Sequence, residues 1–510
     1  MSETTKRPVR LPNVVEAIIP IVVMMGLMLM GFVGDTGYTD AHMPLAVSIC
    51  VACIIGSLCG HSFSDILAGM LDRLNATLEA ILILCTVGLL VASFIMSGTI
   101  PALIYYGLDL LTPQLFLPVG CIMCAIVGLA CGSSWTATAT VGIAFLGIGA
   151  GLGINPAITA GMIISGAYLG DKFSPLSDTT NLAAAVSGTG LFDHVTAMVS
   201  TTAPTFVIAL ILYTILGMSG NISGYDASVA KDLQAAIAAN FNLSPLLLLP
   251  IVVVILACVM KVPGLVGIAI SVLCGVLFAM FTQGMTNIGD IFGALHYGFS
   301  VETGNEIADK LLNRGGMDHQ MWTINLILLA VAYGGALERC GCVESLFGGL
   351  KHKLHSVGQL VLATLLSSLF CDATMCDQFL GIGVPAPLYS DKFDEMGLAR
   401  NMLSRTLEDA GTLWAVMFPW TGCGAYQMGV LGVHPFAYFP YAFVNLLNPI
   451  YAAITAFLGR NIFWADGAYT NLFGKTTMHK PAGAPEEAHE IAMKNLEALR
   501  AAGKAPVPAK

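Results

Sequence analysis

Two groups of carboxylate and hydroxyl side chains lie inside a chain that is otherwise strongly apolar, and together they could hold a small cation. The acids are Asp171 and Asp178 in the first group and Asp377, Glu408 and Asp409 in the second. The oxygen-bearing side chains near them are Ser133, Ser134, Thr136, Ser174, Ser177, Thr179, Thr180, Asn181, Gln378 and Thr412. Hard cations prefer carboxylate, hydroxyl and carbonyl oxygens. We therefore predict that all of these residues bind an ion or a substrate, and that the four aspartates are candidate Na⁺ ligands.

The chemistry of such carboxylates depends on what surrounds them. An ionised and unpaired aspartate near the centre of a bilayer is costly, so it persists by facing a cavity, by pairing, or by binding a proton or a metal cation. Neighbouring carboxylates in a site of low dielectric constant share protons, and the titration then belongs to the group. A site that takes either H⁺ or Na⁺, but not easily both, couples the two gradients in opposite directions. This pattern favours antiport.

A structural role for the same acids is the alternative. Asp171 could pair with Lys172 or with Arg405 and merely stabilise a helix break. Lys172 itself is either a counter-charge or a long side chain that reaches toward the membrane surface. Arg405 precedes Glu408 by three residues, so the two could pair on one helix, and we favour a structural role for that pair.

The two acidic groups occur in matching segments of the two halves, which indicates an internal repeat. The interrupted apolar runs and the polar segments that follow them are 131–136 and 170–181 in the first half and 371–378 and 405–412 in the second. The later segments share an Asp-x-x-Ser/Thr pattern that begins at Asp171 and at Asp409, and each continues into a proline, Pro175 or Pro419. Glycine and proline are also ordinary in membrane helices, so coincidence is the competing explanation.

Interrupted helices have a physical meaning inside a membrane. Backbone N–H and C=O groups in lipid must be paired, so irregular backbone survives only beside protein or a polar cavity. Unwinding frees carbonyls and helix ends, which can hold a cation or the anionic group of a substrate. Corresponding broken segments in two halves of a chain therefore indicate the binding site of a transporter.

The elements that position these residues must be membrane helices. The chain has 510 residues, of which 56% are hydrophobic and 11% are charged, whereas soluble domains carry about 25% charged residues. The sequence predicts an all-α polytopic membrane protein of about 11 to 13 transmembrane helices, with inverted repeats, re-entrant hairpins and discontinuous helices. The apolar runs that are too short to span alone, and that we interpret as half-helices or hairpin arms, are 136–152, 155–169, 357–371 and 378–390.

The chain divides by hydropathy into a series of segments. They are a cytoplasmic N-terminus at 1–12, a first transmembrane half at 13–283, an inter-repeat loop at 284–320, a second transmembrane half at 321–460 and a cytoplasmic tail at 461–510. Basic residues such as Arg73 and Arg339 mark the cytoplasmic side. We expect a short helix in the inter-repeat loop, a tail helix at 484–502, and a multi-pass location in the inner membrane.

Cysteines offer a different hypothesis, a metal or redox enzyme embedded in the membrane. The chain has 14 cysteines, and the pairs Cys50/Cys53 and Cys121/Cys124 each lie on one helix face. Such an enzyme would need cysteine and histidine ligands that converge with tetrahedral geometry. We favour buried cysteine as a small apolar residue, and we expect no catalytic residue and no cofactor.

The string GDKFSPLSDTTNLA at 170–183 resembles the hallmark of the NhaC family of sodium/proton antiporters, within the wider ion-transporter superfamily. Further strings that resemble this family are GSSWTATATVG at 132–142, NRGGM at 313–317, DQFLGI at 377–382, LSRTLEDAGT at 403–412 and PYAFVNLLNPI at 440–450. Together they extend over roughly residues 10–460, which is the whole membrane domain.

The resemblance implies an inner-membrane carrier that exchanges Na⁺ for H⁺. The paired broken segments predict that it works by alternating access. The resemblance also implies that the ion site includes 171–181, Asp377, Gln378, Glu408, Asp409 and Thr412. Some members are similar to malate/lactate exchangers and others to amino-acid carriers, so a small organic anion or amino acid is the alternative substrate. Cys371, Asp372 and Trp414 are unusual and leave the substrate open. The expected partners are Na⁺, H⁺ and membrane lipid, with a homodimer as a further expectation and no nucleic acid.

Overall fold

The computed structural model describes residues 8–33, 40–219, 227–260, 262–347 and 353–508. Within these residues, eight helices are long and apolar enough to cross a membrane. The bent pair Ser228–Asn240 and Pro245–Ala257 would add a ninth, and the shorter apolar helices His42–Leu58 and Phe443–Phe457 bring the total to eleven. The predicted polytopic all-α fold is confirmed, and the lower end of the predicted helix number is reached when broken and short helices are counted.

The first half runs from α1 to α13, and its membrane helices are separated by short breaks. Its elements are α1 (Val14–Val33), α2 (His42–Leu58), α3 (Phe63–Met96), α4 (Thr99–Leu110), α5 (Pro113–Cys131), α6 (Ser134–Ala137), η1 (Thr138–Gly142), α7 (Ile143–Gly151), α8 (Pro156–Phe173), α9 (Asp178–Ser187), α10 (Leu191–Met218), α11 (Ala227–Asn240), η2 (Pro245–Leu248), α12 (Leu249–Val259) and α13 (Gly264–Thr282). Local sequence sets the helix starts, because Pro113 and Pro156 occupy first-turn positions where no backbone N–H is needed.

The second half follows a segment of short helices and ends in a small cap. The short helices are α14 (Ile288–Tyr297), α15 (Glu306–Leu312) and η3 (Asp318–Gln320). The second half contains α16 (Met321–Arg339), α17 (Cys342–Phe347), α18 (Val357–Met375), α19 (Gln378–Gly383), α20 (Pro385–Glu395), α21 (Arg400–Trp414), η5 (Ala415–Met417), α22 (Gly422–Leu431), α23 (Pro435–Tyr438), η6 (Phe439–Tyr441) and α24 (Phe443–Phe457). The cap contains β1 (Ile462–Phe463), β2 (Ala468–Thr470), β3 (Thr476–Met478) and α25 (Glu486–Ala501).

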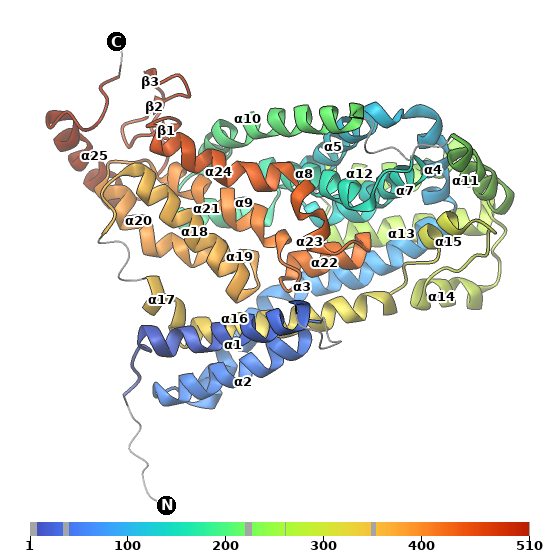
Figure 1. Ribbon diagram of the computed structural model, residues 1–510, viewed down its shortest axis with the longest axis horizontal. Coiled ribbons are helices and arrows are strands. Elements are labelled where there is room, and N and C mark those ends of the chain that lie inside the picture. Colours follow the sequence, from blue (N-terminus) through green and yellow to red (C-terminus); the bar gives the residue numbers. More distant parts are fainter. Residues whose placement is uncertain (1–7, 34–39, 220–226, 261, 348–352, 509–510) are drawn as a thin grey trace, which may run out of the picture.

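The long helices run side by side along the long axis of the molecule (Figure 1). Helices α11, α14 and α15 lie at the right-hand end of Figure 1, and α20, α25 and the strands lie at the left-hand end. Along the flanks, large apolar side chains are exposed on α10 and α13, including Ile211, Ile215, Leu273 and Leu277. Such faces suit lipid, because hydrocarbon chains can cover them.

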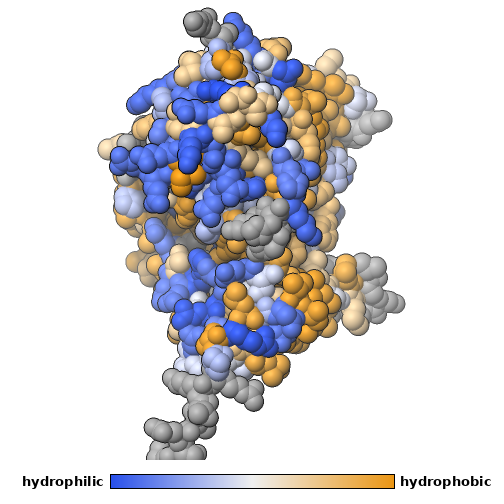
Figure 2. All heavy atoms as spheres, turned by 90° about the vertical axis from the view of Figure 1, so that its left-hand side faces the viewer, coloured by the Kyte–Doolittle hydropathy of each residue, from blue (hydrophilic) through white to orange (hydrophobic). Residues whose placement is uncertain are grey.

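The C-terminal cap is a small structure that the sequence did not predict in full. The strands form an antiparallel sheet in the order β1-β2-β3, with Phe463 opposite Tyr469 and Tyr469 opposite Thr477. Helix α25 packs on α20 and agrees closely with the helix expected at 484–502. The end of the molecule that carries this cap is largely hydrophilic, with hydrophobic residues along one flank (Figure 2).

The two halves of the sequence are not two separate bodies. Helix α16 from the second half packs on α2 and α3, and α22 packs on η1 of the first half. Helices α5 and α8 cross very closely, because a Cβ atom at Gly166 or Gly170 would overlap the backbone carbonyls of Cys121 or Ala125. Small residues at such crossings let membrane helices approach each other. Helices from the first and second halves of the sequence therefore pack against each other in one membrane domain.

Both predicted interruptions at 131–136 and 371–378 are helix breaks with the same local geometry. Gly132 and Cys376 are the C-cap residues that follow α5 and α18, and they have φ values of 64° and 61°. The next residues, Ser133 and Asp377, are extended and cap α6 and α19 by accepting backbone N–H groups. A left-handed residue followed by a polar N-cap therefore turns the chain in both halves.

The later polar segments also break in a matching way. Ser174 and Phe418 are extended residues that precede Pro175 and Pro419, and a new helix, α9 or α22, begins shortly after each proline. The shared Asp-x-x-Ser/Thr pattern, however, is not equivalent in space. Asp171 lies in the last turn of α8, whereas Asp409 lies in the middle of α21, well before its break.

Candidate functional site

Three buried carboxylates belong to Asp171, Glu408 and Asp409. They lie where the C-terminal end of α8 and the N-terminal end of α9 contact α21. Asp171 is held by the first helix break. Its Oδ2 atom accepts hydrogen bonds from the backbone N–H and the hydroxyl of Ser134, at 2.9 Å and 2.7 Å. The N-terminal turn of α6 therefore binds a carboxylate, as helix N-termini commonly do.

Glu408 is fully buried and has more hydrogen-bond donors than the other two acids. Its Oε1 atom accepts hydrogen bonds from the hydroxyls of Thr179 and Thr180, each at 3.1 Å, and from Thr412 at 3.4 Å. Its Oε2 atom lies 2.7 Å from Nε2 of His194, whose Nδ1 lies 2.8 Å from the hydroxyl of Ser404. Residues of α9, α10 and α21 therefore converge on one carboxylate.

Asp409 forms the main ionic link between the halves. Its Oδ1 atom pairs with the ammonium group of Lys172, and both side chains are fully buried. The same oxygen accepts hydrogen bonds from Asn448 at 2.7 Å and from Thr201 at 3.1 Å. Arg405 Nε lies 3.6 Å from Asp409 Oδ2. Lys172 is thus a counter-charge, and not a side chain that reaches toward the membrane surface.

A chain of hydroxyl groups connects Asp171 to Glu408. Ser177 lies beside the Asp171 carboxylate, and its hydroxyl donates to the hydroxyl of Thr179 at 3.0 Å. Thr179 in turn donates to Glu408. The hydroxyls of Ser177 and Thr179 thus link Asp171 in the first half of the sequence to Glu408 in the second half. Hydroxyl groups of this kind can pass a proton or ligate a cation.

Acidic and basic side chains are both buried in this cluster. Lys172 and Arg405 are the basic side chains, and both are fully buried. The carboxylates of Asp171, Glu408 and Asp409 surround them, with His194 in contact with Glu408. The cluster therefore offers more carboxylates than the two basic side chains Lys172 and Arg405.

Asp377 and Gln378 lie in a separate region. Asp377 Oδ1 accepts the backbone N–H of Phe379 at 2.6 Å and thereby caps α19. Gln378 Oε1 accepts a hydrogen bond from the thiol of Cys423 on α22, at 3.1 Å. Asp377 also lines a cavity of about 970 Å³ between α3 and α19, together with Arg73 and Glu338. The structure does not bring Asp377 into the Asp171–Glu408–Asp409 cluster.

The remaining candidates from the sequence occupy supporting positions. Ser133 caps α6 by accepting the N–H of Thr136, and Ser174 accepts the N–H of Leu176. Asn181 donates to the carbonyls of Pro175 and Ser177 and so closes the break before α9. Asp178 is exposed at the start of α9, outside the cluster.

The structure also corrects one pairing and adds three residues. Arg405 contacts Asp409, the carbonyl of Asn461 and the hydroxyl of Ser200, and not Glu408 as expected. Asp171 is held by Ser134, and not by Lys172 or Arg405. The residues that sequence reasoning missed are His194, Thr201 and Asn448. The sequence signal that could have identified them is the presence of polar side chains within the apolar helices α10 and α24.

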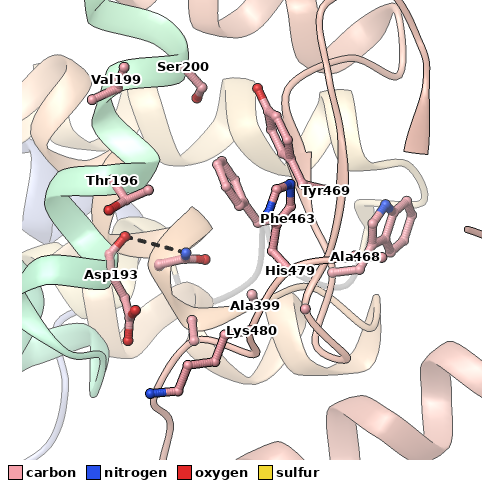
Figure 3. A pocket seen from close by; sticks show the side chains of 14 residues that line it. Asp193, Thr196, Val199, Ser200, Ala399, Phe463, Ala468, Tyr469, His479 and Lys480 are labelled. Atoms are coloured by element: carbon pink, nitrogen blue, oxygen red, sulfur yellow. Dashed lines mark hydrogen bonds between the residues drawn. The ribbon is translucent and has the colours of Figure 1, made fainter. Parts of the chain in front are cut away.

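A pocket of about 480 Å³ lies directly outside the cluster, between α10 and the C-terminal cap. Figure 3 shows Asp193, Thr196 and Ser200 along α10, with Tyr469 and His479 of the cap across from them. At its inner wall, Ser200 accepts a hydrogen bond from Arg405 at 3.2 Å, and Arg405 contacts Asp409. Ser200 in the pocket wall therefore contacts Arg405, which in turn contacts the buried Asp409.

The cysteine hypothesis finds no site in the residues that the structure describes. Cys50, Cys53, Cys121 and Cys124 are free thiols. Within the described ranges, no three His, Cys, Asp or Glu side chains form a group that could hold a metal ion.

Long apolar helices, helix breaks in both halves and a buried charged cluster between α8, α9 and α21 are typical of a polytopic membrane transporter. The sequence profile of the Na⁺/H⁺ antiporter family matches residues 166–460 of this chain. The chain belongs to this family.

Curated relatives agree with this assignment. The Na⁺/H⁺ antiporter NhaC of Alkalihalophilus pseudofirmus is 39% identical over 82% of this chain and 90% of its own length. The malate-2H⁺/Na⁺-lactate antiporter of Bacillus subtilis is 35% identical over 90% of this chain and 97% of its own length. The arginine/ornithine antiporter ArcD of Halobacterium salinarum is 35% identical over 90% of this chain and 95% of its own length. The predicted resemblance to the NhaC family is confirmed.

Proposed function

We propose that the protein exchanges Na⁺ for H⁺ across the inner membrane, and that the two ions compete for the Asp171–Glu408–Asp409 cluster. The meeting of three buried carboxylates with the buried side chains of Lys172 and Arg405 is the observation that carries the proposal. A Na⁺ ion and a proton that bind the same carboxylates compete, because a second added positive charge in a buried site is costly. Mutually exclusive binding of this kind is sufficient for antiport.

The geometry supports a cation position between Asp171 and Glu408. Carboxylate oxygens from both residues and the hydroxyls of Ser177, Thr179 and Thr180 surround the region where the two halves meet. These are the ligand types that hard cations prefer. Asp409 is committed to Lys172, so its role in the proposal is to fix that lysine and to hold α8 against α21.

Movement of the broken helices would expose the cluster alternately to the two sides. The breaks before α6, α9, α19 and α22 lie in both halves, and broken helices around a binding site are typical of secondary transporters. The pocket beside the C-terminal cap supports an entry route from the side that carries both termini, the predicted cytoplasmic side. Proton and Na⁺ exchange through this pocket would reach Arg405 and Asp409 first.

A carrier of small organic anions or amino acids is the second candidate. Its support is the buried pair of cations, Lys172 and Arg405, and the malate/lactate and arginine/ornithine exchange named for two relatives. Atoms Nε and Nη2 of Arg405 lack a hydrogen-bond partner among the described residues. A guanidinium group of this kind suits a carboxylate.

Proteoliposomes that contain a pH-sensitive dye separate the two candidates. Addition of Na⁺ to vesicles with an imposed pH gradient should produce dequenching if Na⁺/H⁺ exchange occurs. A panel of organic acids and amino acids is tested in the same vesicles by counterflow. Solute uptake without a Na⁺ response would overturn the first proposal and support the second.

We also propose a multi-pass location in the inner membrane and assembly as a homodimer. The exposed apolar faces of α10 and α13 support contact with lipid. Crosslinking in native membranes checks the dimer, and fractionation checks the location.

A further inference from the structure

One buried acid takes no part in the cluster described above. Asp372 on α18 is fully buried. Neither of its carboxylate oxygens receives a hydrogen bond from any residue that the structure describes. The other buried acids, by contrast, accept hydrogen bonds: Asp171 from Ser134, Glu408 from threonines, Asp409 from Asn448 and Asp377 from a backbone N–H.

The surroundings of Asp372 form a small polar site. Ser368 lies one turn earlier on the same face of α18, is fully buried, and its hydroxyl also has no partner among the described residues. Gly381 of α19 packs directly on both residues, because a Cβ atom there would overlap Asp372 Oδ1 and would lie 3.3 Å from the Ser368 carbonyl. The glycine therefore leaves room for the carboxylate at the second helix break.

Among the described residues, the groups that act electrostatically on Asp372 include no cation, and Arg73, which acts on Asp377, is paired with Glu338. Electrostatic neighbours within the described chain are Cys371 on α18, Asp377 at the start of α19 and Cys423 on α22. Tyr389 of α20, which interacts with Cys371, hydrogen-bonds to Ser367. An ionised carboxylate in this setting would be uncompensated, and such a group takes up a proton or a cation instead.

Asp372 is enclosed, but its acidic neighbour Asp377 lines a cavity. Asp377 interacts electrostatically with Asp372 and lines the cavity of about 970 Å³ between α3 and α19. That cavity reaches the surface, where the lining residues Ala76, Glu344 and Pro387 are exposed. A proton that enters this cavity would reach Asp372 by way of Asp377.

We propose that Asp372, with Ser368, forms a second proton-binding site, which exchanges its proton during the transport cycle. In each cycle the O–H bond of the protonated carboxyl breaks, the proton leaves through the cavity, and the carboxylate takes up a proton again from the other side. The inference rests on the proposed Na⁺/H⁺ exchange, and it raises the number of protons moved per cycle by one above that of the Asp171–Glu408–Asp409 cluster.

Infrared difference spectroscopy of the reconstituted protein tests this site directly. The expected result is a Na⁺-induced loss of a carboxylic C=O band that is absent in Asp372→Asn and shifted in Ser368→Ala, which removes the neighbouring hydroxyl. Asp290→Asn, at an exposed acid of α14, is the matched control and should keep the band. Identical difference spectra for the wild type and Asp372→Asn would overturn the proposal.

The coupling ratio gives a second readout. In proteoliposomes clamped at fixed membrane potential, the Na⁺ gradient that just balances an imposed pH gradient reports the number of protons per Na⁺. Asp372→Asn should lower this number by one, and an unchanged number would also overturn the proposal. If Na⁺ elicits no response but a pH jump still produces the Asp372 band, the Na⁺/H⁺ exchange fails while the second proton site stands. Should Asp372→Asn not fold, the band shift in Ser368→Ala decides.

Discussion

The buried ion pair between Lys172 and Asp409 allows a quantitative test, because it joins α8 to α21 inside the molecule. Removing one partner of a buried pair destabilises a protein by about 3–5 kcal/mol. In Lys172→Met, Asp409 keeps its hydrogen bonds from Asn448 and Thr201, so we expect the lower end, about 3 kcal/mol. In Asp409→Asn the lysine loses its carboxylate, and we expect about 4–5 kcal/mol.

The double variant separates this interaction from general damage. Lys172→Met with Asp409→Asn should cost about 2–3 kcal/mol less than the sum of the two single changes, because no unpaired lysine remains. Arg405 loses Asp409 in the single Asp409 variant and in the double variant alike, so this loss cancels in the comparison. The free energy of unfolding is measured by reversible SDS unfolding in mixed micelles for the wild type, both single variants and the double variant.

A matched control comes from a more exposed pair on other helices. Arg73 and Glu338 also form an ion pair, but their side chains are 32% and 38% exposed, so the coupling in Arg73→Met with Glu338→Gln should be about 0–1 kcal/mol. A coupling energy at Lys172–Asp409 no larger than this control would refute the view that the pair locks the two halves together.

Three further predictions follow from single contacts. Asp171→Asn should abolish Na⁺-driven proton movement in proteoliposomes while exposed Asp178→Asn retains it, and equal loss in both would contradict the assignment of the site. His194→Ala removes the contacts to Glu408 and Ser404 and should lower the free energy of unfolding by about 2–3 kcal/mol, whereas an effect below 1 kcal/mol would show that these contacts are unimportant. Gly132→Ala should destabilise the protein by about 1–2 kcal/mol, because its φ of 64° is left-handed and a Cβ atom there would overlap Leu176; unchanged stability would contradict this.

The sequence predicted the helix breaks well because their signals are local. Gly132 is the residue type that tolerates a left-handed conformation, and Pro175 and Pro419 force the preceding residue into an extended conformation. Asp171, Glu408 and Asp409 stand out because acids are rare in apolar helices. Residue type and spacing were therefore sufficient to nominate the core of the site.

The partners of these acids could not be predicted, because they depend on tertiary packing. His194 and Asn448 lie far from the acidic segments in sequence and reach them through the packing of α10 and α24 on α21. Arg405 was expected to pair with Glu408 three residues later. Its side chain instead contacts Asp409, four residues later on the same helix, and the carbonyl of Asn461 in the cap. Asp178 shares its segment with buried threonines, yet its position in the first turn of α9 leaves it exposed.

The strands of the C-terminal cap could not be predicted from the sequence for a different reason. Its strands are two or three residues long, so they carry too short a pattern for recognition. They are defined by pairing with each other and by the packing of α25 on α20, which are both nonlocal.

Direct competition between Na⁺ and H⁺ at Glu408 and Asp171 is the central claim, and equilibrium Na⁺ binding to the purified protein at a series of pH values tests it most directly. Where one proton competes with one Na⁺, the apparent dissociation constant should rise about tenfold for each pH unit of acidification. Glu408→Gln should weaken this dependence. An apparent dissociation constant that stays the same across the pH series would contradict the account.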